Sequence, residues 1–464
     1  MKTGETTLVA GSFRDPSGFL FWRDGSLYRQ VNGGYAQAFD YLIQSGLYGE
    51  LTKSGLLVEH EEVRPALGIS ADAYKVLKPR LIPFISYPYE WCFSHLKNAA
   101  LATLHIQQKA LEKGMSLKDA NAYNIQVLES RQVLIDILSF ERYVEGRPWV
   151  AYKQFCEHFL APLALMCKRD VRLGQLLRIH LEGIPLDLAR SLLPIGSKLN
   201  PSIWLHIVMH SRSQRTHQST TIRRETITKT FTRRSFFALL DSLETAIHKL
   251  TWRWDRGHWI NYYEGQHNYT DDALDQKANI ASEFLDRIRP QTVWDIGANT
   301  GKFSRLACTR ASYVVSWDLD PACVEHNYST MLTAGEKNIL PLLLDVTNPT
   351  PGIGWDNTER MSFTDRGAID AVLALGLIHH LALANNVPLS RIASFFQKLG
   401  DWLIVEFVPK DDSQVRRLLA MRDDVFPRYS QQDFKEEFGK FFSIESEKPI
   451  PQTSRTLYLM RKLR

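Results

Sequence analysis

The sequence has little cysteine, and the arrangement of that cysteine argues against a metal site or a disulfide framework. The five cysteines are scattered along 464 residues without a Cys-x-x-Cys pair. Their spacings match neither zinc sites nor small disulfide-rich domains. We therefore expect a protein of the reducing cytoplasm that holds no metal.

Long apolar runs are missing as well. The amino-terminal segment has no apolar stretch of the kind that forms a secretory signal, and Arg14 and Asp15 soon follow it. The most apolar later stretch, around 369–384, contains Asp370 and falls short of the ~20 apolar residues that cross a bilayer. The sequence predicts neither export nor a membrane span.

Neither sign of charge dominates the sequence. The net charge is +5, from 56 Lys and Arg against 51 Asp and Glu. So small a surplus does not indicate DNA or RNA binding, and we expect no nucleic-acid partner. The length exceeds the roughly 250 to 300 residues at which a single hydrophobic core stops growing, so the default is at least two domains.

A basic stretch divides the chain. Between positions 211 and 235 Arg, Lys, Ser and Thr are abundant and Glu225 is the only acid. We expect an accessory domain over 1–210, a linker or long loop over 211–235, and a second domain over 236–464. The stretch either connects the two domains as a solvated segment or, in the alternative, binds an anionic partner. The oligomeric state stays open.

The apolar pattern differs on the two sides of this stretch. Before it, helical periodicity dominates, over 99–113 and 152–167, with short strand-like runs at 81–85 and 132–137. This predicts a mixed α+β, helix-rich domain. After it, helices are expected over 235–250 and 273–288, and strands and helices then alternate. The expected strands are 293–296, 313–317, 339–344, 369–375 and 402–407, with a closing antiparallel hairpin at 441–445 and 456–460. Such alternation predicts an α/β fold with a doubly wound, mostly parallel sheet.

A turn suited to the close approach of a ligand follows the first of these strands. Glycines let a ligand meet bare backbone, as in the dinucleotide-binding turn. Here the glycine spacing is GxxxG instead of GxGxxG, and the acid at the strand end would repel a pyrophosphate but attract the ammonium group of a methionine moiety. The sequence thus favours S-adenosyl-L-methionine over NAD. The expected loop residues are Asp295, Gly297, Ala298, Asn299, Thr300 and Gly301.

Acids also end the next two strands. Asp318, which Leu319 follows, stands about twenty residues after the glycines, where a carboxylate accepts hydrogen bonds from two ribose hydroxyls. Asp345 offers an acceptor for an adenine amino group, and Val346 an apolar contact for its ring. Each carboxylate could instead cap a helix or accept hydrogen bonds in a turn. Three acids closing three successive strands favour the cofactor site.

These ordered motifs resemble the class I, seven-strand methyltransferases over roughly the last half of the chain. Asn299 stands where many members carry a third glycine. The resemblance implies a seven-strand sheet, S-adenosyl-L-methionine as cofactor, and Leu375, at the end of the fourth strand, beside the transferred methyl. The segments 252–263, 375–380, 406–410 and 455–458, with 27–30 near the amino terminus, resemble more narrowly a bacterial group that includes a rhizobial nodulation methyltransferase.

Three side chains are candidates to take a proton from the methyl acceptor. Methyl transfer is an in-line displacement, so the protein mainly supplies alignment and, for a hydroxyl acceptor, a base. His379 and His380 follow the fourth strand, and Glu406 ends the fifth. In the alternative, the histidines pack at a helix start or bind a carbonyl, and Lys410 or Arg455 holds Glu406. The Asn/Asp-Pro-Pro-aromatic tetrapeptide of nucleic-acid amino methylation is absent, so we expect a small-molecule, glycan, lipid or protein acceptor.

A fainter pattern lies in the first half. Asp119 and Asn124 stand five positions apart, and Asp136 ends a later strand-like run. This order resembles the catalytic and metal-binding loops of kinases. However, Leu117 replaces the expected His, and we find no convincing glycine-rich loop or partnered lysine upstream. We expect a degenerate kinase-like, substrate- or partner-binding module in which the three side chains converge; an active phosphotransferase and coincidence are the alternatives.

Two functions of different classes therefore compete. One is a methyltransferase with an accessory amino-terminal domain, and the other is a binding scaffold whose two halves are both inactive. The intact loop with Asp295, Gly297, Gly301 and Asp318 favours the enzyme.

Overall fold

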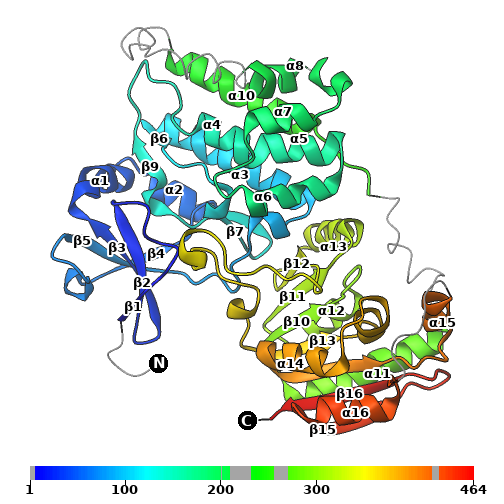
Figure 1. Ribbon diagram of the computed structural model, residues 1–464. Coiled ribbons are helices and arrows are strands. Elements are labelled where there is room, and N and C mark those ends of the chain that lie inside the picture. Colours follow the sequence, from blue (N-terminus) through cyan, green and yellow to red (C-terminus); the bar gives the residue numbers. More distant parts are fainter. Residues whose placement is uncertain (1–5, 200, 210–230, 255–269, 421–427, 464) are drawn as a thin grey trace. The chain divides into compact units, whose positions relative to one another are not determined.

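The computed structural model describes residues 6–199, 201–209, 231–254, 270–420 and 428–463. They form two compact units (Figure 1): 1–253 with 353–360, and 254–352 with 361–464. Most of the stretch 211–235 lies outside the described residues. Helix α10 (Arg233–Lys249) starts at its end and belongs to the first unit, because its buried apolar stripe packs against α3. The division between the units thus falls at Arg253, later in the chain than the linker that we expected.

The first unit begins with a five-strand antiparallel sheet. The strand order is β1-β2-β3-β5-β4, and the chain passes through two short helices between β3 and β4. The elements are β1 (Thr6–Leu8), β2 (Gly18–Arg23), β3 (Ser26–Asn32), α1 (Ala36–Gln44), α2 (Leu47–Lys53), β4 (His60–Val63) and β5 (Ala73–Pro79). The expected strand at 81–85 is wrong: this run is irregular, and Pro83 within it has no N–H to give to a ladder.

A helical part completes the first unit. Two antiparallel ribbons follow α3, pairing β6 with β9 and β7 with β8, and the loops between them carry Asp119 and Asp136. The expected helix at 152–167 is confirmed, with a π-helical turn, η6, in its middle. The elements are α3 (Phe93–Glu112), β6 (Met115–Leu117), β7 (Ile125–Leu128), β8 (Arg131–Leu134), β9 (Phe140–Arg142), α4 (Tyr152–Phe155), η6 (Cys156–Leu160), α5 (Ala161–Lys168), α6 (Leu176–Ile179), α7 (Leu186–Leu192), α8 (Pro201–Ile203) and η9 (Trp204–Met209).

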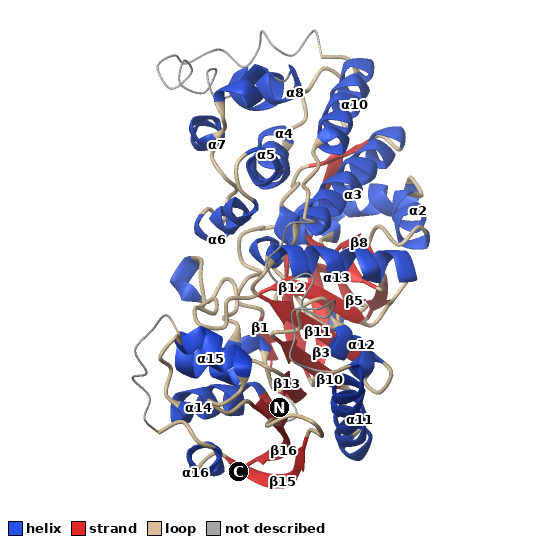
Figure 2. Cartoon of the chain, turned by 90° about the vertical axis from the view of Figure 1, so that its right-hand side faces the viewer, coloured by secondary structure: helices blue, strands red, loops and turns tan. Residues whose placement is uncertain are grey.

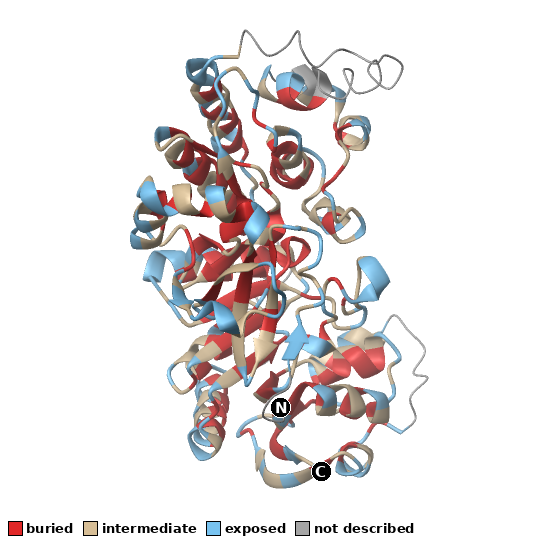
Figure 3. Ribbon diagram, turned by 90° about the vertical axis from the view of Figure 1, so that its left-hand side faces the viewer, coloured by how far each residue is buried: buried red, intermediate tan, exposed pale blue. Residues whose placement is uncertain are grey.

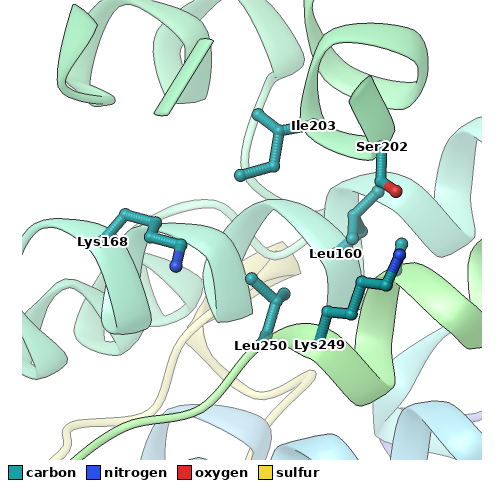
Figure 4. A pocket seen from close by; sticks show the side chains of 7 residues that line it. Leu160, Lys168, Ser202, Ile203, Lys249 and Leu250 are labelled. Carbon is teal, nitrogen blue, oxygen red and sulfur yellow. The ribbon is translucent and has the colours of Figure 1, made fainter. Parts of the chain in front are cut away.

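A small hollow lies among these helices (Figure 4). Leu160, Lys168, Ile203, Lys249 and Leu250 line it together with Ser202 and Ala246. Its volume of about 10 Å³ is room for about one water molecule. A hollow of this size is too small for a substrate.

The second unit is a seven-strand sheet with the order β12-β11-β10-β13-β14-β16-β15. The first five are parallel to one another, and β16 runs antiparallel to both β14 and β15. This confirms the doubly wound, mostly parallel sheet and its closing hairpin. The strands are β10 (Thr292–Ile296), β11 (Tyr313–Asp318), β12 (Ile339–Leu343), β13 (Ile369–Ala374), β14 (Gly400–Phe407), β15 (Phe442–Pro449) and β16 (Thr456–Lys462). The helices are α11 (Asp271–Ile288), α12 (Lys302–Cys308), α13 (Pro321–Ala334), η13 (His380–Ala384), α14 (Leu389–Leu399), α15 (Ser413–Leu419) and α16 (Gln431–Gly439).

Helices cover both faces of this sheet (Figure 2). Val293 packs into the core that α11 and α12 build, whereas the next residue, Trp294, packs against Phe363 on the opposite face. With both faces covered, the central strands are buried along most of their length (Figure 3). None of the helices among the described residues combines the length and apolarity that a bilayer crossing needs.

Candidate active site

The cofactor loop leaves β10 in a left-handed turn. Gly297 and Gly301 have φ of 82° and 84°. A Cβ on Gly301 would lie 2.5 Å from Asn327 Oδ1 and 2.6 Å from Arg305 Nη1, so a larger residue would have to displace these side chains as well as adopt a strained backbone. Asn299 also has a positive φ, 53°. Asparagine is one of the few residues that tolerates this conformation, which explains why it can replace the third glycine of the family pattern.

The Asp318 side chain is hydrogen-bonded to this loop. Its Oδ2 accepts a hydrogen bond from the Asn299 backbone N–H at 2.6 Å, and its Oδ1 accepts one from Asp320 N at 2.8 Å. A carboxylate oxygen can accept more than one hydrogen bond, so the half-buried carboxylate keeps acceptor capacity for two ribose hydroxyls. Burial raises the pKa of Asp318 to about 6, against the lowering effect of the backbone N–H groups. The carboxylate is therefore largely ionised at neutral pH.

Asp295 points into the face that α11 and α12 cover. Its Oδ2 accepts a hydrogen bond from Ser304 Oγ of α12 at 2.6 Å, and the residue is only 2% exposed. Burial raises the pKa of Asp295 to about 7. Its charge is thus present at neutral pH only in part, and a nearby cation would favour it.

The other expected cofactor residues lie at the same, carboxyl, edge of the sheet. Leu344 N donates to Asp318 O at 2.9 Å, which joins the ends of β11 and β12. Asp345 Oδ1 accepts hydrogen bonds from Thr347 N and Thr347 Oγ1, so this carboxylate makes the turn hydrogen bonds that were the alternative to cofactor binding. That Asp345 accepts a hydrogen bond from the adenine amino group stays a prediction. Leu375 is buried, Leu319 is exposed, and Ala298, Thr300 and Val346 lie in the turns beside them.

The two histidines follow β13: His380 is the first residue of the π-helical turn η13, and His379 directly precedes it. Their rings lie against one another with centroids 4.2 Å apart and planes tilted by 38°. His379 is buried, and its Nδ1 has no hydrogen-bond partner among the described residues, whereas His380 is half-buried. Burial lowers the pKa of both, and the positive charge of Arg455 lowers it further. Both imidazoles are therefore neutral at pH 7, each with a nitrogen lone pair, and the lowered pKa makes each a weaker base than a free histidine.

Glu406 lies in a buried charged cluster, which consists of Lys277, Glu406, Asp412 and Arg455. Lys277 Nζ donates to Glu406 Oε2 at 2.7 Å, and Arg455 Nη1 lies 3.3 Å from Oε1. Arg455 also binds Asp412, with Nε to Oδ2 at 2.8 Å. Arg455 is the partner named in the structural alternative for Glu406. Since a cation binds each of its oxygens, Glu406 is less suited than the histidines to take a proton.

Lys277 and Asp412 were missed in the sequence. Lys277 falls on the buried stripe of α11, between Ala273 and Ala281, where an apolar residue is the rule. A lysine in that position of an otherwise regular amphipathic helix signals a buried ionic partner. Asp412 caps α15, accepting from Gln414 N, and nothing in its sequence context distinguishes it from an ordinary helix cap.

The three kinase-like side chains of the first unit do lie together. Asn124 Nδ2 donates to Asp119 Oδ2 at 3.0 Å, and the pKa of Asp119 is raised first by burial and then by the charge of Asp136. Arg29 of β3 forms an ion pair with Asp136, with Nη1 2.6 Å from Oδ1, and Ser139 Oγ donates a hydrogen bond to Oδ2. The expected convergence is confirmed. An arginine, which the sequence did not reveal as a partner, neutralises the carboxylate that would hold magnesium in a kinase.

Comparison with known proteins gives a relative along almost the whole chain. No protein-family model matches the chain. Nodulation protein NoeA from Rhizobium meliloti (strain 1021) is 35% identical over 459 residues, which cover 98% of this chain and 96% of NoeA.

Solved structures match less than half of the chain. The N-methyltransferase NodS from Bradyrhizobium japonicum WM9 has 10% identity and a TM-score of 0.32, over 42% of this chain and 98% of NodS. The magnesium protoporphyrin IX methyltransferase ChlM from Synechocystis PCC 6803, with bound SAH, has 16% identity and a TM-score of 0.31, over 44% of this chain and 91% of ChlM. WbdD has 16% identity and a TM-score of 0.31, over 43% of this chain and 42% of WbdD.

The seven-strand, mostly parallel sheet with a glycine turn after its first strand is the fold that the class I methyltransferase motifs predicted. The bond from Asn299 N to the Asp318 carboxylate adds a contact within that turn. The segment 252–263, which also carried the narrower resemblance, lies mostly outside the described residues. Given its likeness to NoeA over nearly the full length of both proteins, the chain belongs to the NoeA family, and its second unit has the seven-strand, mostly parallel sheet that is typical of class I methyltransferases.

Proposed function

We propose that this chain transfers the methyl group of S-adenosyl-L-methionine to an oxygen or nitrogen atom of a small molecule, glycan, lipid or protein. The observation that carries the proposal is the left-handed loop from Gly297 to Gly301, with the Asp318 carboxylate bonded to Asn299 N at its centre. Bare backbone next to a fixed carboxylate fits the ribose and methionine parts of the cofactor. When bound, the cofactor supplies a methyl carbon activated by a sulfonium.

His380 is the best-placed of the three candidate bases. It is half-buried, so an acceptor can reach it, and its ring lies against that of the buried His379. In the proposed step, a neutral imidazole takes the proton from the acceptor hydroxyl or amine as the bond to the methyl carbon forms and the bond from that carbon to sulfur breaks, so that the neutral thioether leaves. His379 and Glu406 would then hold this ring and the turn that carries it.

The first unit is proposed to bind the methyl acceptor or a partner protein. In its kinase-like constellation Arg29 neutralises Asp136, and Ser139 binds the second oxygen of that carboxylate. An unshielded Asp136 would favour a second, phosphate-transferring activity; the ion pair favours a binding role.

The name of NoeA indicates a biological process, nodulation. We propose that this chain, like its relative, acts in nodulation, where methylation would change the recognition properties of a signal or surface molecule. Expression of the chain in a Rhizobium meliloti strain that lacks NoeA tests this. Restored nodulation on the affected host would support the proposal, and a strain that stays deficient despite active protein would contradict it.

One experiment tests the proposed chemistry. The full chain is titrated with S-adenosyl-L-methionine in a calorimeter and then incubated with bacterial extract and cofactor labelled in the methyl group. Binding together with a labelled product is expected, with His380→Ala retaining binding and losing turnover. Failure to bind the cofactor would favour the inactive scaffold instead.

A further inference from the structure

A row of buried polar side chains runs behind the cofactor loop, from α12 and α13 across β11 to the end of β10. Ser304 Oγ lies 2.6 Å from Asp295 Oδ2 and 2.9 Å from Ser316 Oγ. Asn327 Nδ2 lies 2.8 Å from Ser316 Oγ, and Arg305 Nη1 lies 2.9 Å from Asn327 Oδ1. The two serines and the asparagine are almost completely buried, so the hydrogen bonds of the row take the place of water.

The chemistry of the two ends fixes the direction of every bond in this row. A guanidinium only donates, so Asn327 turns its amide oxygen toward Arg305 and its NH2 group toward Ser316. An ionised carboxylate only accepts, so the single proton of the Ser304 hydroxyl goes to Asp295. The Ser316 hydroxyl must then donate the bond between the two serines. The row is therefore a donor chain: each member donates toward Asp295, which favours the ionised form of that carboxylate.

Arg305, at the outer end of the donor chain, is itself held in place and also holds the cofactor loop. Glu336 binds it at two points, with Nε to Oε1 at 2.8 Å and Nη2 to Oε2 at 3.0 Å. Arg305 Nη1 also donates to Thr300 O at 2.9 Å and lies 3.3 Å from Gly301 O. One guanidinium thus fixes both the loop carbonyls and the orientation of the asparagine that begins the chain.

The Asp295 carboxylate keeps one oxygen for a ligand. Among the described residues its side chain makes a single hydrogen bond, from Ser304 to Oδ2, so Oδ1 has acceptor capacity left. A carboxylate held ionised in a buried position gains most from a ligand that brings a positive charge and N–H donors. An ammonium group has both.

We propose that the donor chain holds Asp295 as an ionised carboxylate whose second oxygen receives the ammonium group of the cofactor's methionine part. Its members are positioning residues, since none of them touches the transferred methyl: Ser304, Ser316, Asn327 and Arg305. The inference rests on the proposed function, because it assigns the loop to S-adenosyl-L-methionine. It adds a role for buried side chains of α12, β11 and α13 that lie outside the loop and the strand-end acids.

Two thioether ligands separate an effect on the ammonium group from an effect on the loop. S-adenosyl-L-homocysteine carries the ammonium group, whereas methylthioadenosine has the same nucleoside and sulfur without the amino acid. The full chain is titrated with each in a calorimeter at pH 7. Ser304→Ala should raise the Kd of S-adenosyl-L-homocysteine about tenfold, the cost of one hydrogen bond to a charged group, and leave that of methylthioadenosine nearly unchanged.

A double-mutant cycle tests whether the serines act as a chain. Ser316 reaches Asp295 only through Ser304. Ser316→Ala alone should therefore weaken S-adenosyl-L-homocysteine binding, but the double variant should bind no worse than Ser304→Ala. Thr330→Val is the matched control, because it removes a hydroxyl of α13 that donates to His326 O; it should leave the affinity for both ligands unchanged.

Three results would overturn the inference: unchanged binding of S-adenosyl-L-homocysteine in folded Ser304→Ala protein, equal losses for the two ligands, or additive losses in the double variant. Should Ser304→Ala not fold, Asn327→Asp takes its place. The aspartate still accepts from Arg305 but has no proton to give to Ser316, so it too should weaken S-adenosyl-L-homocysteine selectively. Failure of the unaltered chain to bind S-adenosyl-L-methionine would instead contradict the proposed function, so the two failures are distinguishable.

Discussion

Replacement of Asp318 by alanine should weaken cofactor binding without unfolding the protein. The substitution removes the acceptor for two ribose hydroxyls and leaves the N–H groups of Asn299 and Asp320 without their carboxylate partner. Hydrogen bonds to a charged group are worth about 1.5 to 3 kcal/mol. Since about 1.4 kcal/mol is a factor of ten in affinity, the dissociation constant should rise about tenfold to a hundredfold.

Calorimetric titration with S-adenosyl-L-methionine measures this loss, and thermal melting checks the fold. The matched control is Asp320→Ala, which removes the acid two positions later that caps α13 through Ala322 N. The control should cost about 1 kcal/mol of stability and leave affinity nearly unchanged. The pKa of Asp318, about 6, adds a second signature: wild-type affinity should fall as the pH drops below 6 and the carboxylate gains a proton. Unchanged affinity in folded Asp318→Ala would remove this residue from the cofactor site.

Three further predictions follow from single side chains. Gly301→Ala should destabilise the protein by more than Gly335→Ala. Both glycines have positive φ, but only a Cβ at position 301 would meet a neighbour, Asn327 Oδ1 at 2.5 Å. The melting temperatures of the two variants separate the cost of this contact from that of the backbone strain, and equal decreases in melting temperature would contradict the close packing. Burial raises the folded-state pKa of Asp295 to about 7 from its unfolded value of about 3.9, so stability is lost as the pH rises between the two. Asp295→Asn should therefore raise the melting temperature at pH 8 but not at pH 4 while weakening cofactor binding, and a melting temperature unchanged at pH 8 would refute the burial argument. Finally, the first unit should not turn over ATP, and magnesium-dependent hydrolysis that disappears in Asp136→Ala would show it to be a working kinase.

The strands and the cofactor edge of the second unit were predictable because their signals are local. A parallel strand covered on both faces reads as a short apolar run, and the acids that close β10 and β11 stand directly after such runs. Parallel strands bring their carboxyl ends to one edge, so Asp318 and the loop that follows Asp295 were expected at the same edge. The bond from Asn299 N to Asp318 is the contact that this reasoning implies.

The ionic partners were not predictable, because they depend on contacts between distant segments. Lys277 and Glu406 are far apart in sequence, and α11 must first pack on the sheet before its buried lysine finds a carboxylate. Arg29 and Asp136 meet in the same way, through the packing of the first unit. A buried position for a lysine is visible in the helical pattern of α11, but the identity of its partner is not.

The acids on the α11 face differ in whether a protein cation neutralises them, and this difference bears on the choice of cofactor. Glu406 and Asp412 each bind a cation. Asp295 binds the hydroxyl of Ser304, and among the described residues no ion pair joins it to a lysine or arginine; Lys277 acts on its pKa but donates to Glu406. An acid buried without a counter-ion is costly to ionise, which is why its pKa is raised. A sulfonium-bearing cofactor with an ammonium group brings the missing positive charge, whereas the pyrophosphate of NAD would add a second negative one. The preference inferred from an acid before a glycine turn therefore has its physical basis in a buried carboxylate that no lysine or arginine among the described residues pairs with.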